Sequence, residues 1–267
     1  NDAEPQRPIG SVIHGEGEQI INFPEIHIDL PVADEILSGS DHTLKDLQTL
    51  IDSTKKPYSI QLVPKVDIEV HTKYEKEKEV VNVIGMIEGS DPDLKNEYLI
   101  IGAHLDHVGS QAGKIYFPGA NDNASGSAAL LQIAREFSKA QEKQKRSIIF
   151  VFFASEEQGL YGAKYFSENM KFSKEKVKAM INLDCVGYGD SIQIGGGESA
   201  QALWNIAKQI DNENDKLLVT RTWKGGGADA EPFYEKGIQT LYFVTTNSYK
   251  HLHMLSDKPE TLNQNLF

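Results

Sequence analysis

Short apolar runs alternate along the chain with longer stretches in which apolar residues recur every three or four positions. Four runs are apolar at nearly every position and predict strands buried on both faces of a sheet: residues 98–103, 147–154, 179–183 and 240–244. Four stretches have helical spacing and predict helices: residues 124–139, 159–170, 198–210 and 231–236. Strands that alternate with helices in this way are typical of the α/β class.

The first third of the chain has a weaker pattern. It predicts helices at residues 31–37 and 43–53. Short apolar or alternating runs predict further strands at residues 20–23, 25–30, 59–63, 66–71, 79–87 and, later in the chain, 217–220. We expect the strand at 98–103 to pair beside the strand at 79–87.

These elements predict a three-layer α/β/α fold, in which helices flank a central, mostly parallel mixed β-sheet. The length of 267 residues is enough for one large domain and a small appendage. We therefore expect an N-terminal accessory segment at residues 1–42 and one domain at residues 43–267.

Composition and charge exclude several classes of partner. The chain is 39% hydrophobic and 25% charged, with a formal net charge of −12, so nucleic acid and anionic membrane surfaces are not expected to bind it. No apolar run approaches the ~20 residues of a membrane-spanning helix. Cys185 is the single cysteine, which excludes an internal disulfide and a cysteine zinc cluster. The first residue is Asn, so we expect a processed or trimmed form.

Metal-binding residue types follow the predicted strands at their carboxyl ends, the edge of an open α/β sheet where ligands bind. They are His104, Asp122, Glu157, Asp184 and His253. Two imidazoles and three carboxylates suit zinc or a similar divalent ion, and a pair of metals needs a carboxylate bridge. Asp122 is the expected bridge because it lies between two asparagines just before a helix.

Two further acidic residues are candidates for supporting roles. Glu156 precedes Glu157 directly after a buried strand, where one carboxylate can bind metal while the other accepts a proton from water. The alternative is that the pair only begins a solvated helix. Asp106 lies two residues after His104 and is expected to orient its imidazole, although this spacing fits a loop carboxylate equally well. We interpret His107 as a loop residue and prefer His253 to His251 as a ligand.

At this point the residues resemble a known family, the M28 zinc peptidases. The resemblance covers residues 80–260 and is carried by five motifs in order: Gly-Ala-His-Leu-Asp at 102–106, Gly-Ala-Asn-Asp-Asn-Ala-Ser-Gly at 119–126, Glu-Glu-Gln-Gly-Leu-Tyr-Gly-Ala at 156–163, Asn-Leu-Asp at 182–184, and His253 with Asp257.

The resemblance implies a zinc exopeptidase-like fold and two Zn²⁺ per chain. One ion would be held by His104, Asp122 and Asp184, and the other by Asp122, Glu157 and His253. Glu156 would be the general base and Asp106 the residue that orients His104. The implied activity is that of an aminopeptidase acting on peptide substrates, at an extracytoplasmic (periplasmic or secreted) location.

Three features depart from the family pattern. Leu252 stands where relatives often place a tyrosine before the last histidine, so Tyr249 is the remaining candidate to stabilise the oxyanion. The usual last helix is missing or cut, since the sequence ends at Phe267. Residues 1–42 resemble the tail of a protease-associated domain, which implies a longer natural chain.

Two alternatives share this architecture. A glutaminyl cyclase would use one zinc ion and cyclise an N-terminal Gln, whereas the combination of His104 and Asp106 favours two metals. A non-catalytic binding domain would lack ligands or base, and none is missing here. Dipeptidase and carboxypeptidase action, the metal used in the cell and the oligomeric state stay open.

Overall fold

The computed structural model describes residues 28–69, 77–111, 115–219, 227–246 and 250–266. The described residues divide into two compact units, one up to residue 78 and the other from residue 79 onward. The first unit therefore continues past residue 42, and the predicted segment boundary stays a prediction. The predicted strand at 20–23 lies outside the described residues.

The first unit contains helices α1 (Leu30–Ile36) and α2 (Leu44–Thr54), close to where the sequence predicts them. Thr43 begins α2 with a capping box, in which its side chain accepts from the backbone of Asp46 while the Asp46 carboxylate accepts from the backbone of Thr43. The predicted strand at 59–63 is wrong, because those residues form no regular element. The described part of 66–71 forms none either, and residue 30 of the predicted strand 25–30 begins a helix.

The second unit is built on a six-stranded sheet in the order β1-β5-β2-β6-β8-β7. Its strands are β1 (Val83–Ile87), β2 (Tyr98–His104), β5 (Ser147–Phe153), β6 (Val177–Leu183), β7 (Ile192–Gly195) and β8 (Thr240–Thr245). The four central strands are parallel, and β1 and β7 are antiparallel edges. The predicted mixed, mostly parallel sheet is confirmed.

The expected pairing of residues 98–103 with residues 79–87 is wrong, because β5 lies between β2 and β1. Burial explains the order: β5 is buried along nearly all its length, whereas β1 is largely exposed and suits an edge. The sequence also missed β7, which is only four residues long. In the described part of the predicted strand at 217–220, residues 217–219, one bridge joins Leu218 to Ile192.

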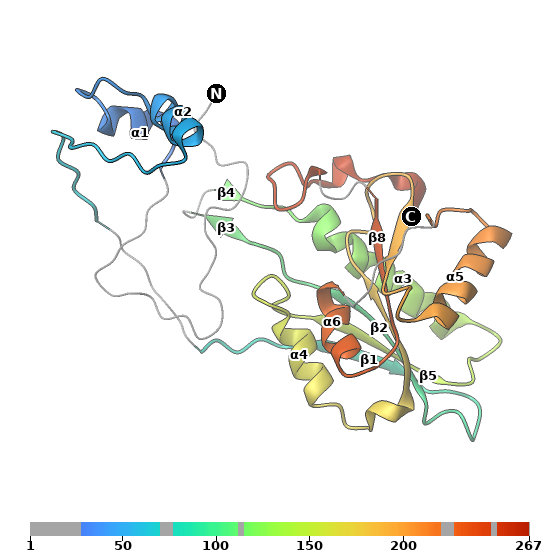
Figure 1. The fold of residues 1–267 in the computed structure, drawn as a ribbon. Coiled ribbons are helices and arrows are strands. Elements are labelled where there is room, and N and C mark those ends of the chain that lie inside the picture. Colours follow the sequence, from blue (N-terminus) through green and yellow to red (C-terminus); the bar gives the residue numbers. More distant parts are fainter. Residues whose placement is uncertain (1–27, 70–76, 112–114, 220–226, 247–249, 267) are drawn as a thin grey trace. The chain divides into compact units, whose positions relative to one another are not determined.

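Helices cover both faces of the sheet (Figure 1). Consecutive residues of β2 enter different cores: Ile100 packs in a cluster with Phe233, and Ile101 in a cluster with Leu130. The first face is covered by α4 (Tyr161–Glu168) and α6 (Glu231–Glu235), and the second by α3 (Gly126–Lys139) and α5 (Gln201–Glu213). The predicted three-layer fold is confirmed.

The described part of the second unit also contains short elements. They are the two-stranded sheet of β3 (Ser110–Gln111) and β4 (Ile115–Tyr116), the π-helix η1 (Ala120–Ser125), and the 3-10 helices η2 (Lys174–Lys176), η3 (Ala228–Ala230), η5 (Pro259–Thr261) and η6 (Gln264–Leu266). Among the described residues, no helix is long and apolar enough to span a membrane.

Helix α3 begins unusually close to the end of β6. A Cβ on Gly126 would lie 2.3 Å from the carbonyl oxygen of Leu183, so glycine permits this approach. The π-helix η1, which directly precedes α3, is thereby held against the carboxyl end of the sheet. This edge also carries the residues that follow β2, β5 and β6.

Candidate metal centre

The structure brings together all five residues for which the sequence predicts a ligand role. His104 is the last residue of β2, Asp122 lies in η1, Glu157 follows β5, and Asp184 follows β6. His253 lies in the loop after β8. These residues span 150 positions of the sequence, and the parallel sheet places them at one edge because strand ends meet there.

The carboxylate of Asp122 stands between the two imidazoles. Its Oδ1 lies 3.3 Å from His104 Nε2, and its Oδ2 lies 3.1 Å from His253 Nε2. Asp122 is buried, so neither oxygen is turned toward bulk solvent. One carboxylate with an oxygen facing each imidazole is the arrangement that a bridging ligand requires.

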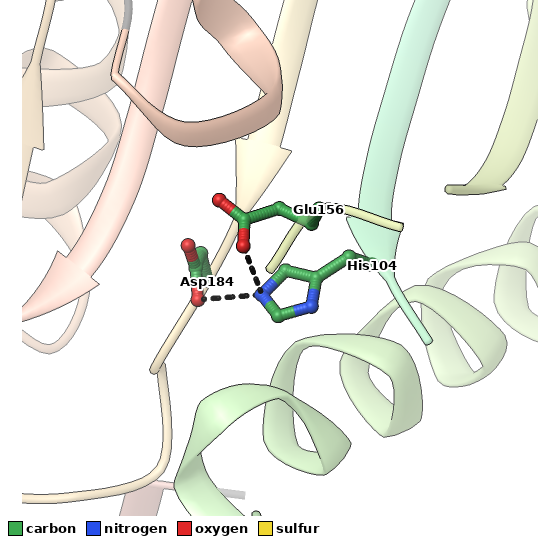
Figure 2. Close-up of side chains that lie close together, drawn as sticks. All are labelled: His104, Glu156 and Asp184. Atoms are coloured by element: carbon green, nitrogen blue, oxygen red, sulfur yellow. Dashed lines mark ion pairs between the residues drawn. The ribbon is translucent and has the colours of Figure 1, made fainter. Parts of the chain in front are cut away.

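His104, Asp184 and Glu156 form a first group (Figure 2). Asp122 contacts this group through His104. His104 Nε2 lies 3.4 Å from Asp184 Oδ1 and 4.0 Å from Glu156 Oε2. His104 is 1% exposed and Asp184 is 6% exposed. Glu156 is thus the more distant of the two carboxylates and leaves space between its oxygen and the ring.

A second group forms around Glu157. His253 Nε2 lies 3.1 Å from Glu157 Oε2, and His107 Nδ1 lies 2.8 Å from Glu157 Oε1. The interpretation of His107 as a loop residue is therefore incomplete, because its side chain contacts the site. The sequence feature that could have indicated this contact is the position of His107, three residues after His104.

Three residues at the site adopt left-handed backbone conformations without being glycine. They are Ser155, directly before Glu156; Cys185, directly after Asp184; and His253 itself, with φ values of 55°, 52° and 52°. Such conformations cost about 1–3 kcal/mol each and persist where the surrounding structure imposes them. Their positions, next to Glu156, next to Asp184 and at His253 itself, indicate that the placement of these site side chains imposes them here.

Asp106 has a wider role than the sequence predicts. Its backbone carbonyl oxygen lies 3.0 Å from His104 Nδ1, whereas its carboxylate is 3.8 Å from that nitrogen. The carboxylate instead accepts hydrogen bonds from the backbone N–H groups of Glu156 and Glu157, at 3.0 and 3.1 Å. Asp106 thus links the end of β2 to the two glutamates after β5.

Asp257 holds the turn of Asp122 as Asp106 holds the two glutamates, by accepting hydrogen bonds from backbone N–H groups. Sequence reasoning assigned Asp257 no role. Its carboxylate accepts from the backbone N–H groups of Asn121 at 2.7 Å and Asp122 at 3.1 Å, and it is 1% exposed. The side chains of Asn121 and Asn123 in turn accept from the backbone N–H groups of Gly187 and Cys185. The loops that carry Asp122, Asp184 and His253 are therefore tied to one another.

Replacing Asp257 with Asn should weaken metal binding. An amide of the same shape has one oxygen in place of two, so one of the two backbone N–H groups loses its acceptor at a buried position, at a cost of about 1–3 kcal/mol. We expect about a tenfold loss of metal affinity, the range typical for residues that support ligands. Urea unfolding and equilibrium dialysis measure both effects, and unchanged affinity in the folded variant would contradict this role.

The carboxyl groups of the site differ in their affinity for protons. Burial raises the pKa of Glu156 to about 8, and the negative charges of Asp184, Glu157 and Asp122 add to this effect. Burial also opposes ionisation of Asp122, but hydrogen bonds from His104 and His253 outweigh it and lower the pKa of Asp122. Hydrogen bonds to Asp122 and Glu157 raise the pKa of His253 to about 10. Without bound metal, Glu156 therefore holds its proton more tightly than Asp122 does.

The donor set fits divalent cations. Oδ1 of Asp184 is buried without a hydrogen-bond partner, and four carboxyl groups crowd around three imidazoles. Buried carboxylates of this kind are stable when they are paired with positive charge. Imidazole nitrogen and carboxylate oxygen are ligands that zinc accepts. Tyr249, the candidate for oxyanion stabilisation, lies outside the described residues.

Comparisons with known proteins agree with this geometry. Residues 82–267 match the model of peptidase family M28. The chain is 29% identical to a probable leucine aminopeptidase of Arthroderma otae over 193 residues, which cover 64% of this chain and 52% of the relative. The chain thus spans about half the length of that relative.

Solved structures share the fold. A zinc aminopeptidase from Bacillus subtilis aligns with a TM-score of 0.57 at 24% identity, over 69% of this chain and 46% of that one. A glutaminyl cyclase from Porphyromonas gingivalis aligns with a TM-score of 0.57 at 22% identity, over 69% of this chain and 71% of that one. At these identities, likeness to the two structures establishes the fold alone.

Proposed function

Since the chain belongs to peptidase family M28, we propose that it is a two-zinc aminopeptidase that hydrolyses the N-terminal peptide bond of peptides. The observation that carries the proposal is the position of Asp122, whose two oxygens lie 3.3 Å and 3.1 Å from two different imidazoles. His104, Asp122 and Asp184 would hold one ion, and Asp122, Glu157 and His253 the other.

Metals bound there would polarise the peptide carbonyl and lower the pKa of an attacking water toward about 7. Glu156 would accept the proton of that water and pass it to the leaving amine, as a general base that then acts as general acid. Its backbone N–H is bonded to Asp106, so the base is anchored to the strand end that carries His104. Asp257 fixes the turn that carries Asp122 by accepting from the backbone N–H groups of Asn121 and Asp122.

Removing metal should abolish peptide hydrolysis. The ligands contributed by separate loops act only through the ions, so dialysis against a chelator is expected to reduce hydrolysis of a short peptide to background. Added Zn²⁺ should restore it with two ions per chain. Full activity in the metal-free protein would contradict the proposal.

The products of a peptide with distinct ends separate the exopeptidase classes. We expect release of the N-terminal residue of a pentapeptide, and no release when that terminus is acetylated. Release from the C-terminus would indicate a carboxypeptidase, and hydrolysis of dipeptides alone would indicate a dipeptidase. An extracytoplasmic location stays a prediction.

A glutaminyl cyclase is the second candidate, because the fold also matches such an enzyme. Identifying the product formed from a peptide with N-terminal Gln separates the cyclase from the aminopeptidase. One metal per chain together with pyroglutamate would favour the cyclase. Two metals with free Gln released would favour the aminopeptidase, which the two imidazoles around Asp122 support.

A further inference from the structure

The contacts of Glu157 point to a further residue that prepares the second metal position. Both oxygens of its carboxylate face an imidazole: Oε2 lies 3.1 Å from His253 Nε2, and Oε1 lies 2.8 Å from His107 Nδ1. A glutamate side chain has several rotatable bonds, so a partner on one oxygen determines where the other points. His107 is that partner.

The imidazole of His107 is held in place by its surroundings. Its side chain is 10% exposed, and its ring meets the ring of His253 edge to face at a centroid distance of 5.6 Å. Gly119 passes directly over it: a Cβ there would lie 2.6 Å from the His107 ring, and the φ of Gly119 is +67°. Glycine at 119 permits both this backbone conformation and the close approach.

His107 is better placed to support a ligand than to be one. Asp122, Glu157 and His253 supply three donors, and a zinc ion that carries out catalysis keeps its fourth position open for water or substrate. A fourth protein ligand would close that position. His107 Nδ1 is also 3.7 Å from Asp122 Oδ2, clearly farther than from Glu157.

We propose that His107 is a positioning residue for the second metal. Its Nδ1–H donates to Oε1 of Glu157 and directs Oε2 toward the ion, so that Glu157 binds through one oxygen. This inference rests on the proposed two-metal function. The inference gives the second histidine of the His-Leu-Asp-His segment at 104–107 a role in metal binding that is separate from the role of His104.

Two kinds of substitution at residue 107 separate the effect of losing the N–H donor from the effect of losing the imidazole ring. His107→Asn keeps an N–H donor near the position of Nδ1, whereas His107→Leu and His107→Ala remove it. His251→Asn is the matched control, because His251 bonds to Ser256 and contacts none of the site carboxylates in the described residues. Cobalt(II) is the probe: its visible absorption reports the ligand set, and equilibrium dialysis reports the affinity of each site.

We expect the unchanged protein to bind two Co²⁺ ions. The two donor-free variants should lose about 10–100-fold in affinity at one site and keep the other, as is typical when a residue supporting a ligand is removed. His107→Asn should stay within about threefold of the unchanged protein with the same cobalt absorption, as should His251→Asn. In peptide hydrolysis the donor-free variants should require more metal for half-maximal rate.

Three results would overturn the inference. Donor-free variants that bind both ions normally would show that the contact is incidental. A changed cobalt absorption in His107→Asn, with affinity as weak as in the donor-free variants, would make His107 a direct ligand. Fewer than two ions in the unchanged protein would overturn the proposed function as well, which distinguishes that failure from the first two.

Discussion

Glu156→Gln is expected to lower kcat for peptide hydrolysis by about 10²–10⁴-fold, the contribution of a general base. The substitution keeps the shape of the side chain but removes its ability to accept a proton. Metal content should stay at two ions per chain, because Glu156 is not one of the proposed ligands. Hydrolysis of a peptide with saturating zinc, together with metal analysis of the same sample, measures both quantities.

Glu168→Gln is the matched control for this substitution. Glu168 is exposed at the end of α4, so its loss should leave kcat unchanged. Glu156→Gln protein with the kcat of the unchanged chain would assign the base to another residue. Loss of one metal ion in that variant would instead place Glu156 among the ligands of the group that it forms with His104 and Asp184.

Asp122→Ala should lower kcat/KM by at least about 1000-fold, because both metal positions lose a shared anionic ligand. We expect fewer than two ions per chain at any zinc concentration that leaves the protein soluble. Inductively coupled plasma analysis after dialysis measures the ratio, and a peptide assay measures the rate. Asp93→Ala, at an exposed position in the turn after β1, is the control.

The fold of the metal-free Asp122→Ala variant can be tested separately from metal binding. Asp122 lies in a buried group with Asp184 and Glu157, so removing one carboxylate does not leave a new unpaired charge. Circular dichroism of the metal-free variant should match that of the unchanged chain. Two bound ions in the folded variant would refute Asp122 as the bridge.

The candidate ligands could be predicted from the sequence because strand ends are readable from hydrophobic pattern. The apolar runs before His104, Glu157 and Asp184 identify buried parallel strands, and such strands deliver their last residues to one edge. The strand order could not be predicted in the same way. Residues 79–87 and 98–103 are neighbours in sequence, but burial of β5 on both faces placed it between them.

Residues that act through backbone contacts leave no pattern in a sequence. Asp257 accepts from N–H groups 135 and 136 positions earlier, and any residue type except proline can provide such a donor. The contact of His107 with Glu157 joins residues 50 positions apart, and the close approach of Gly119 to the His107 ring is likewise a property of the folded chain. The short strand β7 carries too few residues for a periodic signal.

The bonds from Asp257 to the turn of Asp122 have a consequence for synthesis. During translation, His104, Asp122 and the two glutamates are synthesised well before residues 253–257. A nascent chain therefore has most of the donor residues but lacks the imidazole of His253 and the Asp257 carboxylate that fixes the turn of Asp122. Domains fold as units during translation. We therefore expect a growing chain to stay inactive toward other newly made polypeptides until residue 257 has emerged.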